Sequence, residues 1–363
     1  SPPVSGYANV VEALMNCLES EGGRIRHIST VPSFLAKLYP SHIWKFFRAI
    51  YFVIKIVLIS ALLPFYKKIY LNLNGGFSLF FDVIICFLAA TFSKRITLHH
   101  NSCSYLNKKS RLFGCIAYIS QKSGSIHVVN CKLMKDKLST FYGIQDEYIK
   151  IISNISILSS QHYTTSLPKV DTMDPRNSNF CIGYMGYMNR EKGVDNFALV
   201  VSMLQMLPTK NKYNFIGKAV GPIHDQRLMK KLRQDTASFI SYENSVYGDE
   251  RNSFFDSIDV LLFPSKYAVE AEPLTVYHAL ERGIPVISSD IGCLPEILFD
   301  FEDSHSFSQK TFASDTVQAI VKIANKNREQ LKVLKKTIIT QYHDQKLIKE
   351  ENFKLFLKSQ IND

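Results

Sequence analysis

The sequence has no paired-cysteine motif and no long hydrophobic run, and each absence excludes a class of protein. Its seven cysteines are odd in number and scattered, without a C-x-x-C pair. This usage argues against a structural zinc site and is typical of a reducing compartment. Residues 46–70 are rich in apolar side chains, but the uninterrupted run between Lys55 and Lys67 is only 11 residues long. A run of that length is too short to cross a bilayer.

Two apolar segments therefore need another interpretation. Residues 77–92 are interrupted by Asp82 and fit a buried helix between two strands. Residues 46–70 are flanked by Lys and Arg and contain many aromatic side chains. They could lie on an anionic bilayer, or they could form an ordinary helix packed on a parallel sheet. The sequence leaves both interpretations of this segment open.

Length and charge indicate two domains of different character. A chain of 363 residues, 46% of them hydrophobic, is long enough for two globular domains. Residues 1–150 hold 18 Lys or Arg against 7 Asp or Glu, whereas residues 151–363 hold 25 of each. The whole net charge of +11 thus belongs to the first part. An anionic partner, such as a membrane surface, a pyrophosphate lipid or nucleic acid, would explain this asymmetry, and so would a solvated basic face.

The order of strand and helix patterns predicts an α/β protein with two parallel-sheet domains. We expect an N-terminal domain at 1–160, a linker at 161–178, a second domain at 179–340 and a C-terminal helix at 341–363 that packs back on the first domain. Phe353, Leu355 and Phe356 would make that contact. No apolar strand precedes the opening SPPVSG, so we also expect that a first strand is absent from this sequence.

The segment from Phe263 to Ile297 carries the strongest functional signal. An apolar strand ends at Pro264, a loop with two glutamates follows, and Pro273 is suited to the first turn of the next helix. Gly283 then ends that helix before a second strand. A helix that begins at the carboxyl end of a parallel strand offers free backbone N–H groups, which bind phosphate well.

This segment resembles the donor-binding signature of the retaining glycosyltransferases of family 4, which have the two-domain GT-B fold. The matching residues are Pro264-Ser265, Glu270 and the Gly283-Ile-Pro285 strand start. The resemblance implies that Glu270 contacts the donor sugar and that backbone amides near Pro273, Leu274 and Thr275 meet the phosphates. His278 stands where the family has a second Glu, which holds the ribose hydroxyls.

The stretch GYMNREKG, from Gly186 to Gly193, resembles the family's turn in which an Arg and a Lys bind the diphosphate. Such cations stabilise the negative charge that develops on the leaving group. The family's Arg is Tyr187 here, so we assign the Arg role to Arg190, and Lys192 matches directly. The opening SPPVSG resembles the family's glycine loop, which implies that Gly6 lies near the donor diphosphate. We also assign Gly217 to the donor site and take Tyr247 as a candidate for the base pocket.

A pair of histidines follows a strand of the first domain. Adjacent residues at a strand end point apart, and no third ligand has suitable spacing, so His99 and His100 do not predict a metal site. The family often has a His here near the donor sugar and acceptor. We assign that role to His99, with His100 as the alternative, and a purely structural histidine is the competing interpretation.

Taken together, the resemblance implies a metal-independent hexosyltransferase without a cofactor that transfers a sugar from a nucleotide-sugar donor with retention. No Asp-x-Asp metal-binding motif occurs in the sequence. The expected acceptor is a saccharide or a polyprenyl-pyrophosphate-linked saccharide of surface polysaccharide synthesis: O-antigen, capsule or exopolysaccharide. The expected location is the cytoplasm, with peripheral binding to the inner face of the cytoplasmic membrane.

Three other functions remain open at this stage. A nucleotide-sugar epimerase of the same fold would bind the donor alike, and a non-catalytic relative would follow if His278 had weakened donor binding. A nucleic-acid binder would explain the basic charge, but the interleaved aromatic and basic residues of such proteins are missing. We therefore expect no nucleic-acid partner.

Overall fold

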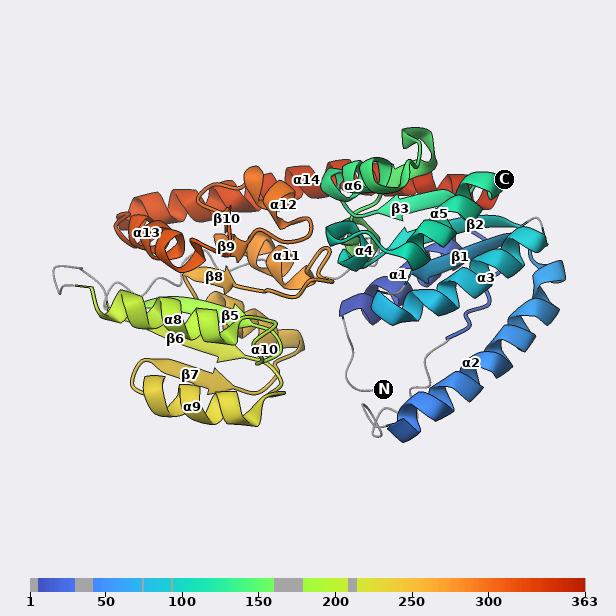
Figure 1. The fold of residues 1–363 in the computed structure, drawn as a ribbon. Coiled ribbons are helices and arrows are strands. Elements are labelled where there is room, and N and C mark those ends of the chain that lie inside the picture. The colour runs from blue at the N-terminus through green and yellow to red at the C-terminus, as the bar shows by residue number, and fades with distance from the viewer. Residues whose placement is uncertain are drawn as a thin grey trace. The chain divides into compact units, whose positions relative to one another are not determined.

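The computed structural model describes residues 6–29, 42–73, 75–92, 94–159, 179–207 and 214–362. The predicted linker at 161–178 and the residues before Gly6 lie outside these ranges. The chain divides into two compact units (Figure 1). Unit 1 comprises residues 1–161, 269–271 and 349–363, and unit 2 comprises residues 162–268 and 272–348. Each unit is described by itself.

Unit 1 is built on a parallel sheet whose strands follow one another in space as they do in sequence, β1-β2-β3-β4. The strands are β1 (Lys68–Leu73), β2 (Arg95–His100), β3 (Ile126–Val129) and β4 (Ile149–Ile151). All but the first residue of β2 are buried, because helices cover this central strand.

The helices of unit 1 cover this sheet, and α3 and α5 pack side by side on β1 and β2 (Figure 1). The helices are α1 (Gly6–Ser20), α2 (His42–Leu62), α3 (Leu79–Thr91), α4 (Ser104–Asn107), α5 (Arg111–Ser123), α6 (Lys132–Tyr142) and α7 (Asn154–Ser159), with 3-10 turns η2 (Leu63–Phe65), η3 (Gly76–Ser78) and η4 (Asp146–Tyr148). Gly124 and Gly143 end α5 and α6 in the left-handed conformation that glycine adopts most easily.

Unit 2 contains a parallel sheet of six strands in the order β10-β9-β8-β5-β6-β7. The strands are β5 (Asn179–Met185), β6 (Asn214–Val220), β7 (Ile240–Glu243), β8 (Val260–Phe263), β9 (Val286–Ser289) and β10 (His305–Phe307). Strands β5, β6 and β7 follow one another towards one edge of the sheet, and β8, β9 and β10 follow one another from β5 towards the other edge. The order is that of the dinucleotide-binding folds, and the direction of building reverses between β5 and β8.

Helices flank every strand of this second sheet. They are α8 (Val194–Gln205), α9 (Gln226–Thr236), α10 (Gly248–Asp256), α11 (Leu274–Glu281), α12 (Leu294–Phe299), α13 (Phe312–Ala324) and α14 (Arg328–Asn362). The apolar strands β8 and β9 are fully buried, as expected for parallel strands covered on both faces. The predicted architecture of two parallel-sheet α/β domains is confirmed.

The long helix α14 contributes to both units, with residues up to Ile348 in unit 2 and Lys349 onwards in unit 1. Within unit 1 the Lys68 ammonium donates to the carbonyl oxygens of Ser359 and Gln360 at 3.3 and 2.6 Å. Phe353, Phe356 and Leu357 are buried, whereas Leu355 is exposed. Leu355 therefore does not share the buried face that the sequence assigned to it.

None of the helices in the described ranges is long and apolar enough to span a membrane. The apolar segment at residues 46–70 forms α2 up to Leu62 and then turns through η2 into β1.

Candidate functional site

The loops that follow β5 and β8 meet at the reversal point of the second sheet. Gly193 has a φ of +77°, and a Cβ there would lie 1.9 Å from the carbonyl oxygen of Pro264. Only glycine allows this approach. The Lys266 amide donates to the carbonyl oxygen of Glu191 at 2.7 Å, which fastens the two loops together. In parallel α/β sheets, ligands bind beside the strand ends at such a reversal point.

Three cations lie on these loops, and two of them are next to a single carboxylate. Asp195, in the first turn of α8, lies 3.2 Å from the Lys266 ammonium and 3.8 Å from the Arg190 guanidinium. Its second oxygen, Oδ1, is buried without a hydrogen-bond partner in the described part of the chain. The Lys192 ammonium lies 4.5 Å from the centre of the Tyr267 ring. The carboxyl edge of this sheet therefore carries an excess of positive charge, suited to an anion.

The start of α11 faces the same edge of the sheet. Pro273 is the N-cap residue with an extended backbone, one position earlier than the first-turn place expected from the sequence. Leu274 and Thr275 are the first two helical residues and are half-buried, and the first amides of a helix lack intrahelical acceptors. The carboxylate of Glu272 is buried and accepts a hydrogen bond from the hydroxyl of Tyr277. This bond ties the loop before α11 to the helix.

His278 contacts a cation that sequence reasoning missed. The Arg251 guanidinium of α10 lies 3.2 Å from His278 Nε2. Burial and the charge of Arg251 lower the pKa of His278 to about 3, so the ring is neutral at pH 7 and Nε2 accepts from Arg251. The family's carboxylate position thus holds a neutral ring beside an arginine. The only sequence signal for a role of Arg251 at this site is its position in the helix that precedes the signature segment.

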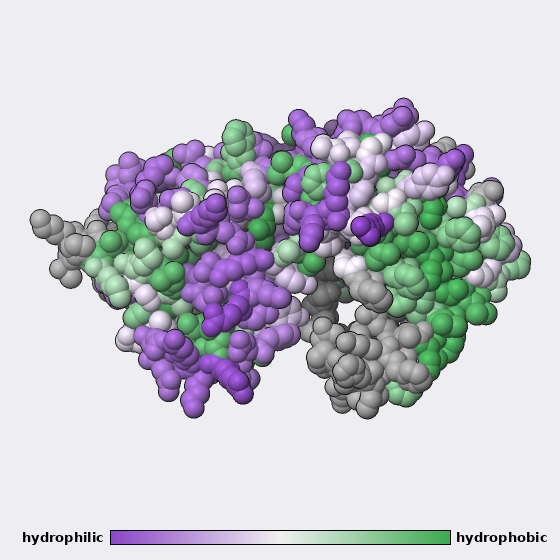
Figure 2. All heavy atoms as spheres, in the orientation of Figure 1, coloured by the Kyte–Doolittle hydropathy of each residue, from purple (hydrophilic) through white to green (hydrophobic). Residues whose placement is uncertain are grey.

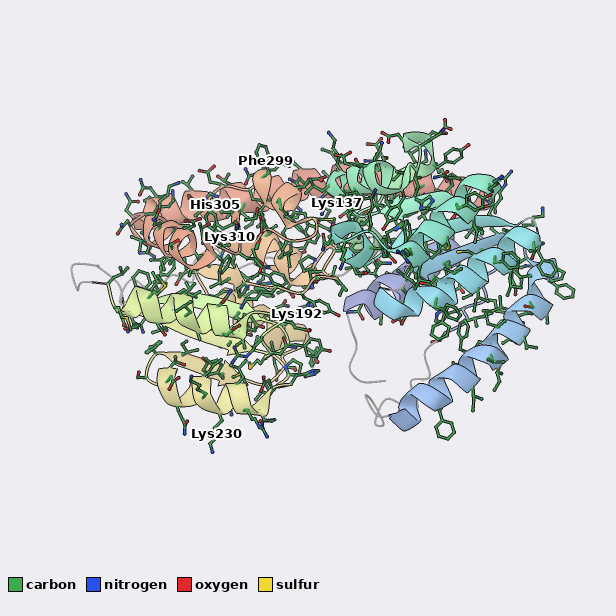
Figure 3. The ribbon with its side chains drawn as sticks, in the orientation of Figure 1. Lys137, Lys192, Lys230, Phe299, His305 and Lys310 are labelled. Atoms are coloured by element: carbon green, nitrogen blue, oxygen red, sulfur yellow. The ribbon has the colours of Figure 1, made fainter. Side chains whose placement is uncertain are left out.

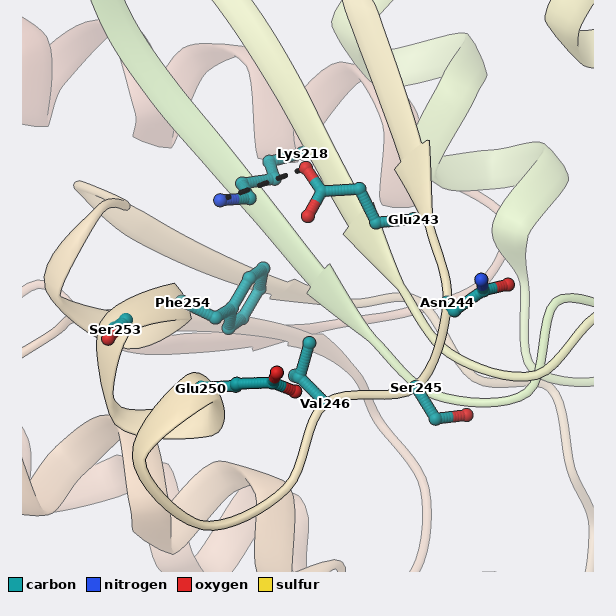
Figure 4. A pocket seen from close by; sticks show the side chains of 8 residues that line it. All are labelled: Lys218, Glu243, Asn244, Ser245, Val246, Glu250, Ser253 and Phe254. Carbon is teal, nitrogen blue, oxygen red and sulfur yellow. Dashed lines mark ion pairs between the residues drawn. The ribbon is translucent and has the colours of Figure 1, made fainter.

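A cavity of about 410 Å³ opens between β6, β7 and α10 (Figure 4). Its lining combines polar side chains with one aromatic ring: Lys218, Glu243, Asn244, Ser245, Val246, Glu250, Ser253 and Phe254. Tyr247 is exposed and caps α10 directly after this loop. Gly217 lies in mid-strand, where a Cβ would meet Ile240 and Phe197 at 3.0 and 3.1 Å. Gly217 therefore allows close helix–strand packing and does not lie at the carboxyl edge. Gly221 does lie at that edge, and a Cβ there would be 1.9 Å from the Gly186 carbonyl oxygen.

The histidine pair lies at the end of β2 in unit 1, and both rings are fully buried. His99 Nδ1 is 3.0 Å from the Tyr70 hydroxyl, and its Nε2 has no partner in the part of the chain that the structure describes. Burial lowers the pKa of His99 to about 3. The ring is therefore neutral, and a ligand would reach its unpartnered Nε2 only if the atoms that cover it moved.

His100 belongs to a chain of hydrogen bonds in which each donor and acceptor follows from the one before. The Ser120 hydroxyl donates to Ala117 O at 2.8 Å, so it accepts from His127 Nε2 at 3.0 Å. The other nitrogen of His127, Nδ1, then accepts from His100 Nε2 at 2.9 Å. His100 Nδ1 in turn accepts from the Tyr105 hydroxyl at 2.8 Å. Both nitrogens of His100 are occupied, which favours His99 over His100 as the ligand-contacting residue.

The remaining predicted residues are distributed over the two units. Gly6 is the first residue of α1 in unit 1. Glu270 is half-buried within the segment Val269–Ala271, which groups with unit 1. Arg190, Lys192, Pro273, Leu274, Thr275 and His278 belong to unit 2, where the loops after β5 and β8 and the start of α11 share the carboxyl edge.

Comparison with known families agrees with this geometry. Residues 174–341 match the family model described as glycosyl transferases group 1. For these residues, the match bears out the resemblance to glycosyltransferases noted from the sequence.

Two curated relatives match less than half of the chain. An uncharacterized 41.2 kDa protein in the cps region of Klebsiella pneumoniae is 27% identical over 44% of this chain and 41% of its own length. The lipopolysaccharide core biosynthesis mannosyltransferase LpsB of Rhizobium meliloti is 25% identical over 44% of each chain. This chain therefore aligns with less than half the length of each relative.

Solved structures are similar over nearly the whole chain. Sucrose-phosphate synthase from Thermosynechococcus elongatus has a TM-score of 0.69 at 14% identity, over 99% of this chain and 94% of its own. The Anabaena HepE protein in complex with UDP and glucose has a TM-score of 0.61 at 14% identity, over 95% and 89%. At such identities the likeness establishes the fold, and the predicted GT-B fold is confirmed.

Proposed function

We propose that this glycosyltransferase transfers a sugar, with retention, from a nucleotide-sugar donor to a saccharide or lipid-linked saccharide acceptor. The observation that carries the proposal is the group of cations at the reversal point of the second sheet. Lys192, Lys266 and Arg190 lie on the two loops there, and the start of α11 lies at the same edge. Cations and helix amides at one sheet edge suit a nucleoside diphosphate.

The chemistry assigns a role to each group. The bond between the anomeric carbon and the donor's phosphate oxygen breaks, and a bond from that carbon to an acceptor hydroxyl oxygen forms on the same face. The hydroxyl proton passes to the leaving phosphate. Lys192 and its neighbouring cations stabilise the negative charge that accumulates on the diphosphate. With these cations present, the proposed reaction requires neither a metal ion nor a cofactor.

The sugar and base contacts follow the family pattern. Glu270 accepts hydrogen bonds from donor sugar hydroxyls, and the open nitrogen of His99 contacts the sugar or the acceptor. The base lies near Tyr247, next to the cavity between β7 and α10. A UDP-sugar is the first donor to test, because a solved structure of similar fold contains UDP and glucose.

The acceptor belongs to surface polysaccharide synthesis in this proposal. The support is the name of one relative, a lipopolysaccharide core mannosyltransferase, and the basic character of residues 1–150. A polyprenyl-pyrophosphate-linked saccharide would satisfy both, since its pyrophosphate is anionic. The enzyme would then work in the cytoplasm, at the inner face of the cytoplasmic membrane.

A thermal-shift screen of nucleotide sugars tests the proposal most directly. A donor at one hundred times its dissociation constant should stabilise the fold by about 2.7 kcal/mol. The positive donor is then incubated with candidate acceptors, and the product's anomeric configuration is determined by NMR. Glu270→Ala should abolish transfer, and Lys192→Ala should reduce the stabilisation to about 0.9 kcal/mol at the same donor concentration. An epimer formed without transfer would identify an epimerase, and the lack of any shift would identify a non-catalytic protein.

A further inference from the structure

Helix α2 exposes a stripe of large apolar side chains. Val53, Ile54 and Val57 are 61%, 60% and 66% exposed, and Phe65 in the following turn is 81% exposed. Together with Ile50, which is 42% exposed, these residues form what we call the outer face. Ile50, Val53, Ile54 and Val57 are spaced by three and four positions, so they share one side of the helix.

The opposite side of α2 holds the helix on unit 1. Phe52 is buried, and its ring centre lies 4.0 Å from that of Phe81 in α3. The outer face is therefore not needed to attach the helix. Leaving its apolar side chains in water is unfavourable, because apolar surface gains free energy when it is buried. Phe87 and Phe92 of α3 are also exposed. Figure 2 shows a continuous apolar area over these two helices.

The charge around this area has one sign. The segment that contains both helices, residues 42–95, has seven Lys or Arg and a single acidic residue, Asp82. Asp82 is only 1% exposed, so it offers no negative charge to a partner. An apolar stripe within a purely basic surface is complementary to an anionic lipid bilayer, whose headgroups attract cations while its acyl chains accept apolar side chains.

We propose that the outer face of α2 inserts into the headgroup region of an anionic bilayer, with α2 lying parallel to the membrane surface. This deepens the membrane part of the proposed function by naming the surface that binds. A second copy of this chain is a poorer occupant, because it would bring the same basic surface into contact with itself. The outer face carries no charged side chain, as an interfacial helix requires on its buried side.

Vesicle flotation without any nucleotide sugar tests this proposal. The full chain should float with vesicles of phosphatidylglycerol and phosphatidylcholine, and bind vesicles of phosphatidylcholine alone at least about tenfold more weakly. Val53→Gln, Ile54→Gln and Val57→Gln together should weaken binding about tenfold or more. Glutamine has a higher helix propensity than valine or isoleucine, so α2 itself should persist, and circular dichroism checks this.

A matched pair of single variants controls for general loss of apolar surface. Phe65→Gln removes a phenylalanine of the outer face, and Phe299→Gln removes one in unit 2 that is 87% exposed (Figure 3). Only Phe65→Gln should reduce flotation. UDP binding should be the same for all variants, so a protein that binds vesicles but no nucleotide refutes the proposed function and leaves this inference standing.

Failure of the wild-type chain to float would overturn the proposal, as would flotation that survives the triple substitution. Light scattering that shows an oligomer broken by the triple substitution would assign the outer face to a second copy instead.

Discussion

Unit 1 buries neutral histidines and surrounds itself with basic side chains, whereas unit 2 places ion pairs at the carboxyl edge of its sheet. His99, His100 and His127 are all at most 1% exposed, and their hydrogen-bond partners are uncharged. In unit 2, Asp195 lies 3.2 Å from the Lys266 ammonium and 3.8 Å from the Arg190 guanidinium at that edge. The two units therefore differ in chemistry: unit 2 carries charged side chains at its sheet edge, as the diphosphate of the proposed function requires, and unit 1 keeps its buried rings neutral.

Acidification should separate the two units most strongly. Burial lowers the pKa of His99 and His127 to about 3 and lowers that of His100 as well. A lowered pKa in the folded state gives stability that is present above the unfolded value near 6.5 and is lost as pH falls towards the folded value. His99 and His127 should each lower the free energy of unfolding of unit 1 by about 2 kcal/mol at pH 5, and His100 should act in the same direction.

Unit 2 has an opposing group that limits its loss. His278 behaves like the histidines of unit 1, but burial raises the pKa of Asp259 to about 6. A raised carboxyl pKa makes the folded state more stable as pH falls through 6, by about 1 kcal/mol at pH 5. Hydrogen exchange, corrected for intrinsic rates, should show β2 and β3 losing protection between pH 7 and 5 more than β5 and β6. Equal losses in both sheets would contradict this contrast.

The second largest effect should come from removing a cation of unit 2. Lys192→Ala should weaken UDP binding roughly 30-fold, because a charge-assisted contact to phosphate contributes about 2 kcal/mol. Isothermal titration measures the change. Lys230→Ala on the exposed surface of α9 is the matched control (Figure 3) and should leave UDP binding within experimental error. A similar loss in both variants would mean that only the overall charge matters.

The two units also differ in how far the sequence could predict them. The order of strand and helix patterns predicted two parallel-sheet domains, and the structure contains both sheets. The signature led to the edge of the second sheet because its residues are close in sequence. The Asp195–Lys266 pair joins residues 71 positions apart, and the His100–His127 bond joins residues 27 apart. No local pattern contains such contacts. Gly217 was assigned to the donor site, but strand β6 continues past it to Val220.

The pair of Asp195 and Lys266 offers a test with effects of opposite sign. Lys266→Met should weaken UDP binding several-fold by removing a cation. Asp195→Asn removes the carboxylate that neutralises Lys266 and Arg190, so it should strengthen UDP binding by about threefold, worth roughly 0.7 kcal/mol. Both effects should shrink at high salt, because the groups are partly exposed. Weaker binding by both variants would show that the pair only positions the two loops.

The smallest predicted effect concerns the residue that departs from the family. His278→Glu restores a carboxylate beside Arg251, whose guanidinium now lies 3.2 Å from the ring. If this position contacts the ribose, the variant should bind UDP about threefold more tightly, since a hydrogen bond to a charged acceptor is stronger than one to a neutral ring. Inorganic diphosphate, which has no ribose, should bind as before. The neutral variant His278→Gln should match the wild type for both ligands. Tighter binding of diphosphate by the Glu variant would point instead to a change in loop structure, and an unchanged UDP affinity would show that Arg251 holds the new carboxylate away from the ligand.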